Sequence, residues 1–227
     1  MSTKNEQEQV LPLLLPIEKN SESQKNTILT NLIKMLTERK LLNLSKQEQH
    51  IKKVTSSQPD DQIYKIPLDY GEKYYGKDIN FMAVRLINQR ITSLSKSSGV
   101  SDFLNVYKSQ PKIIVVAGIN PKIQYMVRVD TATYPNTEIF LERELLINII
   151  DHVSQPKFAL LNDEETKDVL DSYHAKRREM PKMLLNDPIS QYYNAKQGQL
   201  FRIVRPSETA GEAVTYRLVI KGQMKET

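Results

Sequence analysis

Apolar and polar positions follow several different periods along the chain. Between residues 26 and 42, apolar residues recur at the spacing of one helical face, at Ile28, Leu29, Leu32, Ile33, Met35 and Leu36. Asn26 or Thr27 is expected to cap this helix, because a side-chain oxygen there can accept from a free backbone N–H. The uninterrupted polar stretch 18–26 is interpreted as a linker. Residues 43–61 are also polar and predict a second helix followed by a loop.

Farther along, the pattern predicts strands alternating with helices. The segment KIIVVAG at 112–118 is a continuous apolar run, mostly β-branched, which is typical of a buried strand. The other expected elements are strands at 63–70, 81–87 and from 137 onward, and helices late in 91–110 and at 121–129. Pro67 favours an edge position for the strand at 63–70. We expect a flexible N-terminal extension over 1–25 and an α/β domain over 26–150.

The pattern of apolar and polar residues changes around DHVSQPK, 151–157, where we place a domain boundary. The residues beyond it predict a helix at 162–173 capped by Asn162, an extended segment at 180–184, and a short helix with Asp187 as N-cap and Pro188 at its first position. Two strands, QLFRIVRP and EAVTYRLVI, follow. The expected fold class is therefore α+β, with a small C-terminal α/β domain over 151–227 built on an antiparallel sheet.

The last strand has two different faces. Val214, Tyr216, Leu218 and Ile220 fall on one face, which is expected to pack on a core. Ala213, Thr215, Arg217 and Val219 fall on the other. Outward Thr215 and Arg217 fit either a strand with a partner beyond it or a plainly solvated face, and the pattern alone leaves both open.

Composition limits the possible functions. The 32 Lys and Arg residues against 27 Asp and Glu give a net charge of +5 and a pI near 9.1, compatible with nucleic acid or an acidic partner. No cysteine is present, which excludes disulfides and thiolate metal sites and fits a reducing compartment. The three histidines, His50, His152 and His174, are not spaced like metal ligands. No apolar run has the length of a membrane span, and residues 10–17 lack the features of a signal peptide.

Candidate chemistry is sparse. Phosphate-binding glycine loops, the nucleophile elbow and the HExxH motif are all absent from the sequence, so no catalytic or metal residue is assigned. A metal-dependent nuclease is the strongest enzyme alternative, using Asp60 after Pro59 and Glu165 with Lys167. Some hundred residues separate these carboxylates, and Glu165 belongs to a capped helix in the other expected domain, which argues against one shared metal.

Basic residues suggest a second alternative. Lys112, Lys122 and Arg128 interleave with Tyr125, and they could contact phosphates without regard to base sequence. A solvated face explains the same pattern. A free DNA-binding transcription regulator is thus a second possible function.

The C-terminal residues carry a specific resemblance. The order MPKM (180–183), DP (187–188), YYNAKQG (192–198), RPSETAG (205–211) and YR (216–217) resembles the assembly domain of the fifth subunit of eukaryotic-type DNA-directed RNA polymerases, which has a shorter archaeal counterpart. Upstream, His152 falls on a histidine of that family, whereas Phe158 stands where a second histidine is common. The Lys-, Asn- and Ile-rich composition and the leading residues suggest a large DNA virus or a divergent eukaryote as the source.

The resemblance implies a non-catalytic polymerase subunit without a cofactor. Its assembly domain would dock on the largest subunit, and residues 26–150 would form a jaw domain near downstream duplex DNA, with Lys112, Lys122 and Arg128 as DNA-proximal candidates. The protein would work in a nucleus if cellular, or in a virion or cytoplasmic factory if viral, and without a membrane. The expected interface residues are Pro181, Asp187, Pro188, Tyr193, Arg205, Ser207, Glu208, Thr209, Ala210, Gly211, Tyr216 and Arg217. Their charges would fix register, and their small residues would allow close backbone approach.

Overall fold

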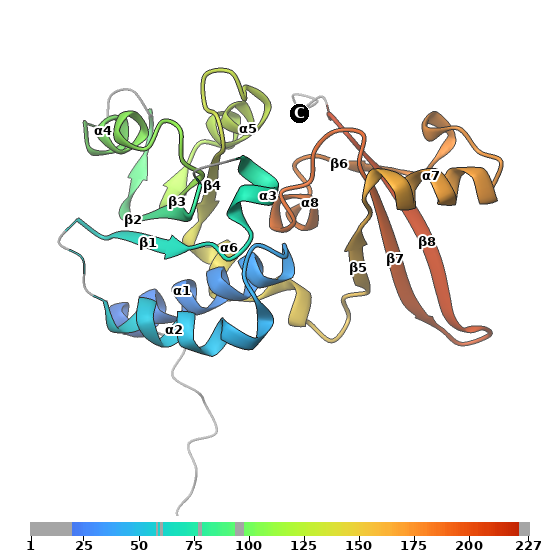
Figure 1. The fold of residues 1–227 in the computed structure, drawn as a ribbon, viewed down its shortest axis with the longest axis horizontal. Coiled ribbons are helices and arrows are strands. Elements are labelled where there is room, and N and C mark those ends of the chain that lie inside the picture. The colour runs from blue at the N-terminus through green and yellow to red at the C-terminus, as the bar shows by residue number, and fades with distance from the viewer. Residues whose placement is uncertain (1–19, 58, 60, 77–78, 94–97, 223–227) are drawn as a thin grey trace, which may run out of the picture.

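Two four-stranded sheets, consecutive along the chain, organise the molecule (Figure 1). The computed structural model describes residues 20–57, 59, 61–76, 79–93 and 98–222. The expected extension over 1–25 lies largely outside these residues. Mixed helices and strands in two sheets confirm the α+β class.

The N-terminal sheet is mixed, in the order β1-β2-β3-β4. Antiparallel β1 pairs with β2, while β2, β3 and β4 are parallel to one another. Because parallel neighbours need a crossover, helices α4 and α5 fill the two connections. Edge strand β1 contains the proline, as expected. The strand bounds are β1 Ile63–Pro67, β2 Phe81–Ile91, β3 Lys112–Ile119 and β4 Thr137–Leu141.

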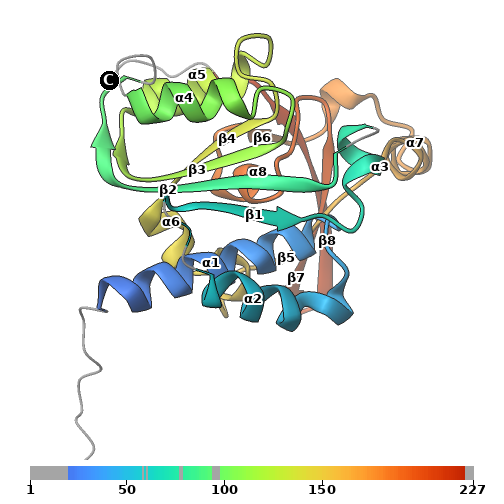
Figure 2. The same ribbon diagram turned by 60° about the vertical axis from the view of Figure 1, so that its left-hand side comes forward.

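Helices cover both faces of this sheet (Figure 2). Strand β3 alternates between them: Ile113 and Val115 join the core under α1 and α2, whereas Ile114 and Val116 pack toward α4 and α5. All residues of the expected helical face, from Ile28 to Leu36, are buried in the first core. The helix bounds are α1 Ser21–Glu38, α2 Gln47–Ser56, α3 Gly71–Tyr75, α4 Ser98–Val106, α5 Pro121–Val129 and α6 Glu142–Leu146, with short 3-10 turns at Leu44–Lys46 and Ile149–Asp151.

The C-terminal sheet has the order β5-β7-β8-β6 and is antiparallel except for the β6–β8 pair. Asn162 caps α7 through a capping box with Glu165, and Asp187 Oδ1 accepts from Ile189 N at 2.9 Å to start α8, both as expected. The bounds are β5 Lys157–Leu160, α7 Asp163–Ser172, a 3-10 turn Arg177–Glu179, β6 Lys182–Leu184, α8 Pro188–Tyr192, β7 Leu200–Ser207 and β8 Gly211–Ile220.

Two expectations about local structure are wrong. Helix α1 begins at Ser21, so residues 21–26 are helical and Asn26 and Thr27 do not cap its start. A polar first turn with Glu22 suits a helix start, because acidic groups there complement the helix dipole. A polar first turn of a helix and a polar linker therefore look alike in the sequence. The segment after β4, whose secondary structure the sequence leaves open, forms the short helix α6.

The third correction concerns β8. Val214 is 40% exposed although alternation predicts that it faces the core, whereas Leu218 and Val219 are both buried. Packing layers cover both faces of the inner end of the strand and neither face of its outer end. Burial on β8 therefore changes with position along the strand more than with the face.

Within the described residues, no helix is both long and apolar enough to cross a bilayer.

Candidate interface at the C-terminal hairpin

Strands β7 and β8 form one long hairpin, called here the C-terminal hairpin, which extends away from the N-terminal sheet (Figure 1). Arg205 pairs with Ala213, and Phe201 pairs with Arg217. Paired residues share a face, and every second residue along a strand returns to it. Arg205 and Arg217 therefore lie on the same face, roughly 13 Å apart along the ladder.

The outer half of the hairpin and, nearer its inner end, Arg217 are exposed. Arg205, Glu208 and Arg217 are solvent-accessible, and within the described part of the chain none of their side chains forms an ion pair or a hydrogen bond. β6 pairs with β8 only over Leu218–Ile220, so the outer part of β8 also has an open backbone edge. Charged side chains and backbone groups are thus available to an external partner.

Small residues build the tip of the hairpin. Ser207 Oγ lies 3.4 Å from Thr209 Oγ1 and accepts from Ala210 N at 3.4 Å, so Ser207 caps the turn. Gly211 has a φ of +71°, a conformation that side-chain-bearing residues rarely adopt. Thr209, Ala210 and Gly211 are all exposed, which leaves the backbone of the tip approachable.

The opposite face of the hairpin carries Val214 and Tyr216. Tyr216 is half-buried, and its ring stands edge-on to Tyr173, the residue after α7, at a centroid distance of 5.7 Å. Val214 is exposed beyond this pair. Arg202, which pairs with Tyr216, and Glu212 are exposed on this face as well, so charged side chains lie on both faces of the hairpin.

The remaining expected interface residues divide into two groups. Pro181 is exposed and Pro188, at the first position of α8, is accessible as well. Asp187 is occupied by its capping bond, and the hydroxyl of Tyr193 donates to Phe158 O at 3.1 Å while its ring packs on Phe201. Asp187 and Tyr193 thus have clear roles in the fold itself.

A second polar cluster, which no pattern in the sequence indicates, lies at the C-terminal end of α8. Arg39, just after α1, is 9% exposed and forms a bidentate pair with Glu138 of β4, both Nη–Oε distances being 2.8 Å. Its Nε donates to Tyr192 O at 2.6 Å, and Nη2 donates to Gln191 O at 3.0 Å. One arginine therefore joins α1, the N-terminal sheet and the end of α8.

Arg128 of α5 completes this cluster. Its Nη2 donates to Ser190 O at 2.7 Å, and burial lowers the pKa of its guanidinium to about 10, so it stays protonated at neutral pH. Arg39 and Arg128 thus hold three consecutive carbonyls at the C-terminal end of α8, where cations are favoured. We call these two arginines, Glu138 and carbonyls 190–192 the arginine junction. Nearby, Tyr125 Oη donates to Gly222 O at 2.8 Å.

The DNA-proximal candidates have different surroundings. Lys112 is 2% exposed, and its Nζ donates to the backbone oxygens of Tyr107, Lys108, Gln110 and Pro135, so its expected contact with DNA is wrong for this fold. Burial also lowers the pKa of Lys112 to about 8. Arg128 belongs to the arginine junction rather than to an open surface. Lys122 is exposed near the start of α5.

The nuclease alternative gains no support. Asp60 lies outside the described residues, and Glu165 accepts from Asn162 N at 2.8 Å within its capping box. Among the residues that the structure describes, His, Asp and Glu form no cluster of three that could hold a metal ion. His152 is exposed and accepts from Ser154 N through Nδ1 at 3.2 Å.

Comparison with known proteins gives consistent matches. A family model described as RNA polymerase Rpb5, C-terminal domain, matches residues 147–219. DNA-directed RNA polymerase subunit 5 of Acanthamoeba polyphaga mimivirus is 32% identical over 213 residues, covering 91% of this chain and 97% of that protein. A viral protein is thus similar along most of the chain.

Two further relatives match shorter parts. The subunit RPABC1 of DNA-directed RNA polymerases I, II and III from Caenorhabditis elegans is 37% identical over 112 residues, 49% of this chain and 53% of that protein. DNA-directed RNA polymerase subunit Rpo5 of Methanocaldococcus jannaschii is 39% identical over 75 residues, 33% of this chain but 96% of that protein.

Proposed function

Because the chain belongs to the RNA polymerase subunit 5 family and is a component of a DNA-directed RNA polymerase, we propose that it acts there as a non-catalytic subunit that docks through its C-terminal hairpin. The observation that carries the proposal is the exposed outer half of that hairpin. Arg205 in that half and Arg217 nearer the inner end, opposite Phe201, share one face and have no side-chain partner among the described residues. Unpaired arginines on a rigid ladder suit recognition of carboxylates, since the guanidinium fork binds them bidentately.

The proposed partner is the largest polymerase subunit, as the resemblance implies. An acidic surface on that subunit would meet Arg205 and Arg217, while the small tip at 209–211 would let the two backbones approach closely. Glu208 at the tip would oppose a cation of the partner and so fix the register. Pro181 and Pro188 would extend the contact area, and Tyr216 would offer a further contact on the opposite face of the hairpin.

The N-terminal part is the jaw in this proposal. We place the division between jaw and assembly domains at residue 151. In support, each part has its own sheet, and the Rpo5 relative is matched over nearly its full length by only a third of this chain. Lys122 remains the candidate for sequence-independent contact with downstream DNA. The site of action would be a nucleus for a cellular enzyme, or a virion or cytoplasmic factory for a viral one.

The test is co-purification with the polymerase. A tagged wild-type chain should recover the largest subunits in fixed stoichiometry. Arg205→Ala combined with Arg217→Ala should lower that recovery at least about tenfold, because charge-assisted contacts at an interface are each worth about 1.5–3 kcal/mol. Unchanged recovery by the double variant would remove the hairpin face from the interface.

A matched control separates location from charge. Arg90 and Arg143 are exposed arginines of the N-terminal part. Arg90→Ala with Arg143→Ala removes the same net charge and should leave recovery of the largest subunits unchanged. A wild-type chain that is recovered only as a free monomer would contradict docking altogether.

A further inference from the structure

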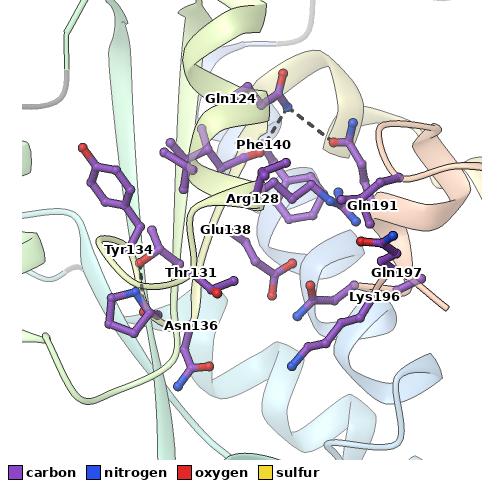
Figure 3. A pocket seen from close by; sticks show the side chains of 18 of the residues that line it. Gln124, Arg128, Thr131, Tyr134, Asn136, Glu138, Phe140, Gln191, Lys196 and Gln197 are labelled. Carbon is purple, nitrogen blue, oxygen red and sulfur yellow. Dashed lines mark hydrogen bonds between the residues drawn. The ribbon is translucent and has the colours of Figure 1, made fainter. Parts of the chain in front are cut away.

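A cleft of about 430 Å³ lies beside the arginine junction, between the two sheets. Its walls come from β4, α5 and the loop between them on one side, and from the segment after α8 on the other (Figure 3). Glu138 and Lys196 enter it from these opposite sides. Its volume falls in the range of sites for small ligands. None of the residues 205–217 lines it.

The charge of the cleft favours an anion. Arg128, Lys196 and Lys221 line it, and Glu138 is the carboxylate among its lining residues. Both oxygens of Glu138 are already taken by Arg39, so this acid is neutralised. The nearby Glu144 adds one more negative charge, but its Oε2 accepts from Leu141 N at 2.9 Å. Even if Glu144 offsets Arg128, the charges of Lys196 and Lys221 remain uncompensated.

The donors of the cleft are also incompletely used. Arg128 donates from Nη2 to Ser190 O, but its Nε is buried without an acceptor among the described residues. A buried cationic donor without an acceptor costs free energy, which a suitable ligand would recover. The exposed Lys196 and Lys221 have no side-chain partner within the described part of the chain. A planar guanidinium and two flexible ammonium groups around one cleft can together donate hydrogen bonds to the oxygens of a phosphate group.

We propose that this cleft binds a small phosphate-bearing anion of the pyrophosphate class, held by Arg128, Lys196 and Lys221. The two lysines would contact the outer phosphate oxygens, and a modest shift of Arg128 would let its free donor reach the inner ones. Such a ligand would bridge the N-terminal and C-terminal parts. Its source is either free pyrophosphate or the polyphosphate chain of a nucleotide, which share this chemistry.

Isothermal titration calorimetry of the purified full chain tests the site. Pyrophosphate should bind with one-to-one stoichiometry and raise the melting temperature roughly with the logarithm of its concentration once this exceeds Kd. ATP in a parallel titration distinguishes the sources: equal or tighter binding points to a nucleotide, and weaker binding points to free pyrophosphate. A lack of saturable pyrophosphate binding, or equal heats from sodium chloride at matched ionic strength, would overturn the proposal.

Variants locate the bound anion. Lys196→Gln and Lys221→Gln should each weaken pyrophosphate binding about tenfold, since removing one close charge in a partly buried cleft costs about 1.4 kcal/mol. Both lysines are exposed, so these changes should not impair folding. Lys182→Gln, at an exposed residue of β6 outside the cleft, is the matched control and should bind like the wild type. Equal affinity in all three variants would place the anion elsewhere and overturn the proposal.

Discussion

Two pairs of arginines in this chain have opposite surroundings. Arg39 and Arg128 are held among the carbonyls of α8, and Arg39 also pairs with Glu138. Arg205 and Arg217 stand on the open face of the C-terminal hairpin with no side-chain acceptor among the described residues. All three side-chain nitrogens of Arg39 and Nη2 of Arg128 donate within the fold, whereas the second pair leaves its donors for something outside the chain. The number of arginines therefore says little about function. Whether their N–H groups already have acceptors within the fold says much more.

The largest expected effect comes from breaking the arginine junction. Arg39→Ala would leave Glu138, whose side chain is 13% exposed, without its counter-charge and would free two carbonyls of α8. Removing one partner of a buried pair costs about 3–5 kcal/mol, and we expect a loss of that size in the free energy of unfolding measured with urea. A loss below about 1 kcal/mol would mean that the two arginine pairs do not differ in this way.

The double variant Arg39→Met with Glu138→Gln is the control for buried charge. It removes both ionised groups, so it should lose less stability than the sum of the two single variants. Full additivity would show that the pair is not coupled.

An intermediate effect is expected from alkaline pH, because tyrosines surround the junction. Burial, together with the charge of Glu138, raises the pKa of Tyr75 to about 12, and burial raises the pKa of Tyr193 to about 12 as well. An unfolded tyrosine ionises near pH 10, so between about pH 10 and 12 the unfolded state binds fewer protons than the folded one. Stability present below pH 10 should then fall by up to about 1.4 kcal/mol per pH unit for each such tyrosine.

Urea unfolding at several values between about pH 9 and 11 measures this slope. Tyr75→Phe should make it shallower, whereas Phe at the exposed neighbour Tyr74 should leave it as in the wild type. A slope that is the same in all three proteins would place the responsible groups away from the junction.

The smallest expected effect concerns the hairpin arginines themselves. Arg205→Ala with Arg217→Ala should change the free energy of unfolding by less than about 0.5 kcal/mol, because exposed side chains without partners contribute little to stability. Chemical denaturation of the isolated chain gives the value. A loss of several kcal/mol would identify the hairpin arginines as structural and erase the contrast with Arg39.

The elements that sequence reasoning predicts well are those with local causes. The continuous apolar run of β3 and the Asp187–Pro188 start of α8 each specify their own structure. The start of α1 is not predictable in this way, because a polar first turn and a polar linker look alike, and only the packing of Ile28 onward distinguishes them. Val214 is mispredicted because alternation indicates which face a residue is on, not where the core ends along the strand.

The site shows the same division. The hairpin and its tip can be identified because the motif is contiguous in sequence. The junction cannot, since Arg39 meets Glu138 and Tyr192 across separations of 99 and 153 residues. Lys112 is mispredicted for the same reason: its carbonyl acceptors come from a turn before β3 and from Pro135, and a lone lysine among apolar residues gives no hint of them.

The hydrogen bonds from Arg39 and Arg128 to the carbonyls of α8 connect the two parts of the molecule. The same short helix that accepts from Arg39 and Arg128 also packs Ile189 into the core beneath β7 and β8. If a partner chain bound the outer end of the C-terminal hairpin, the hydrogen bonds to α8 would therefore also hold the N-terminal sheet in place relative to that partner. Binding at the C-terminal hairpin would thus fix the orientation of the N-terminal sheet.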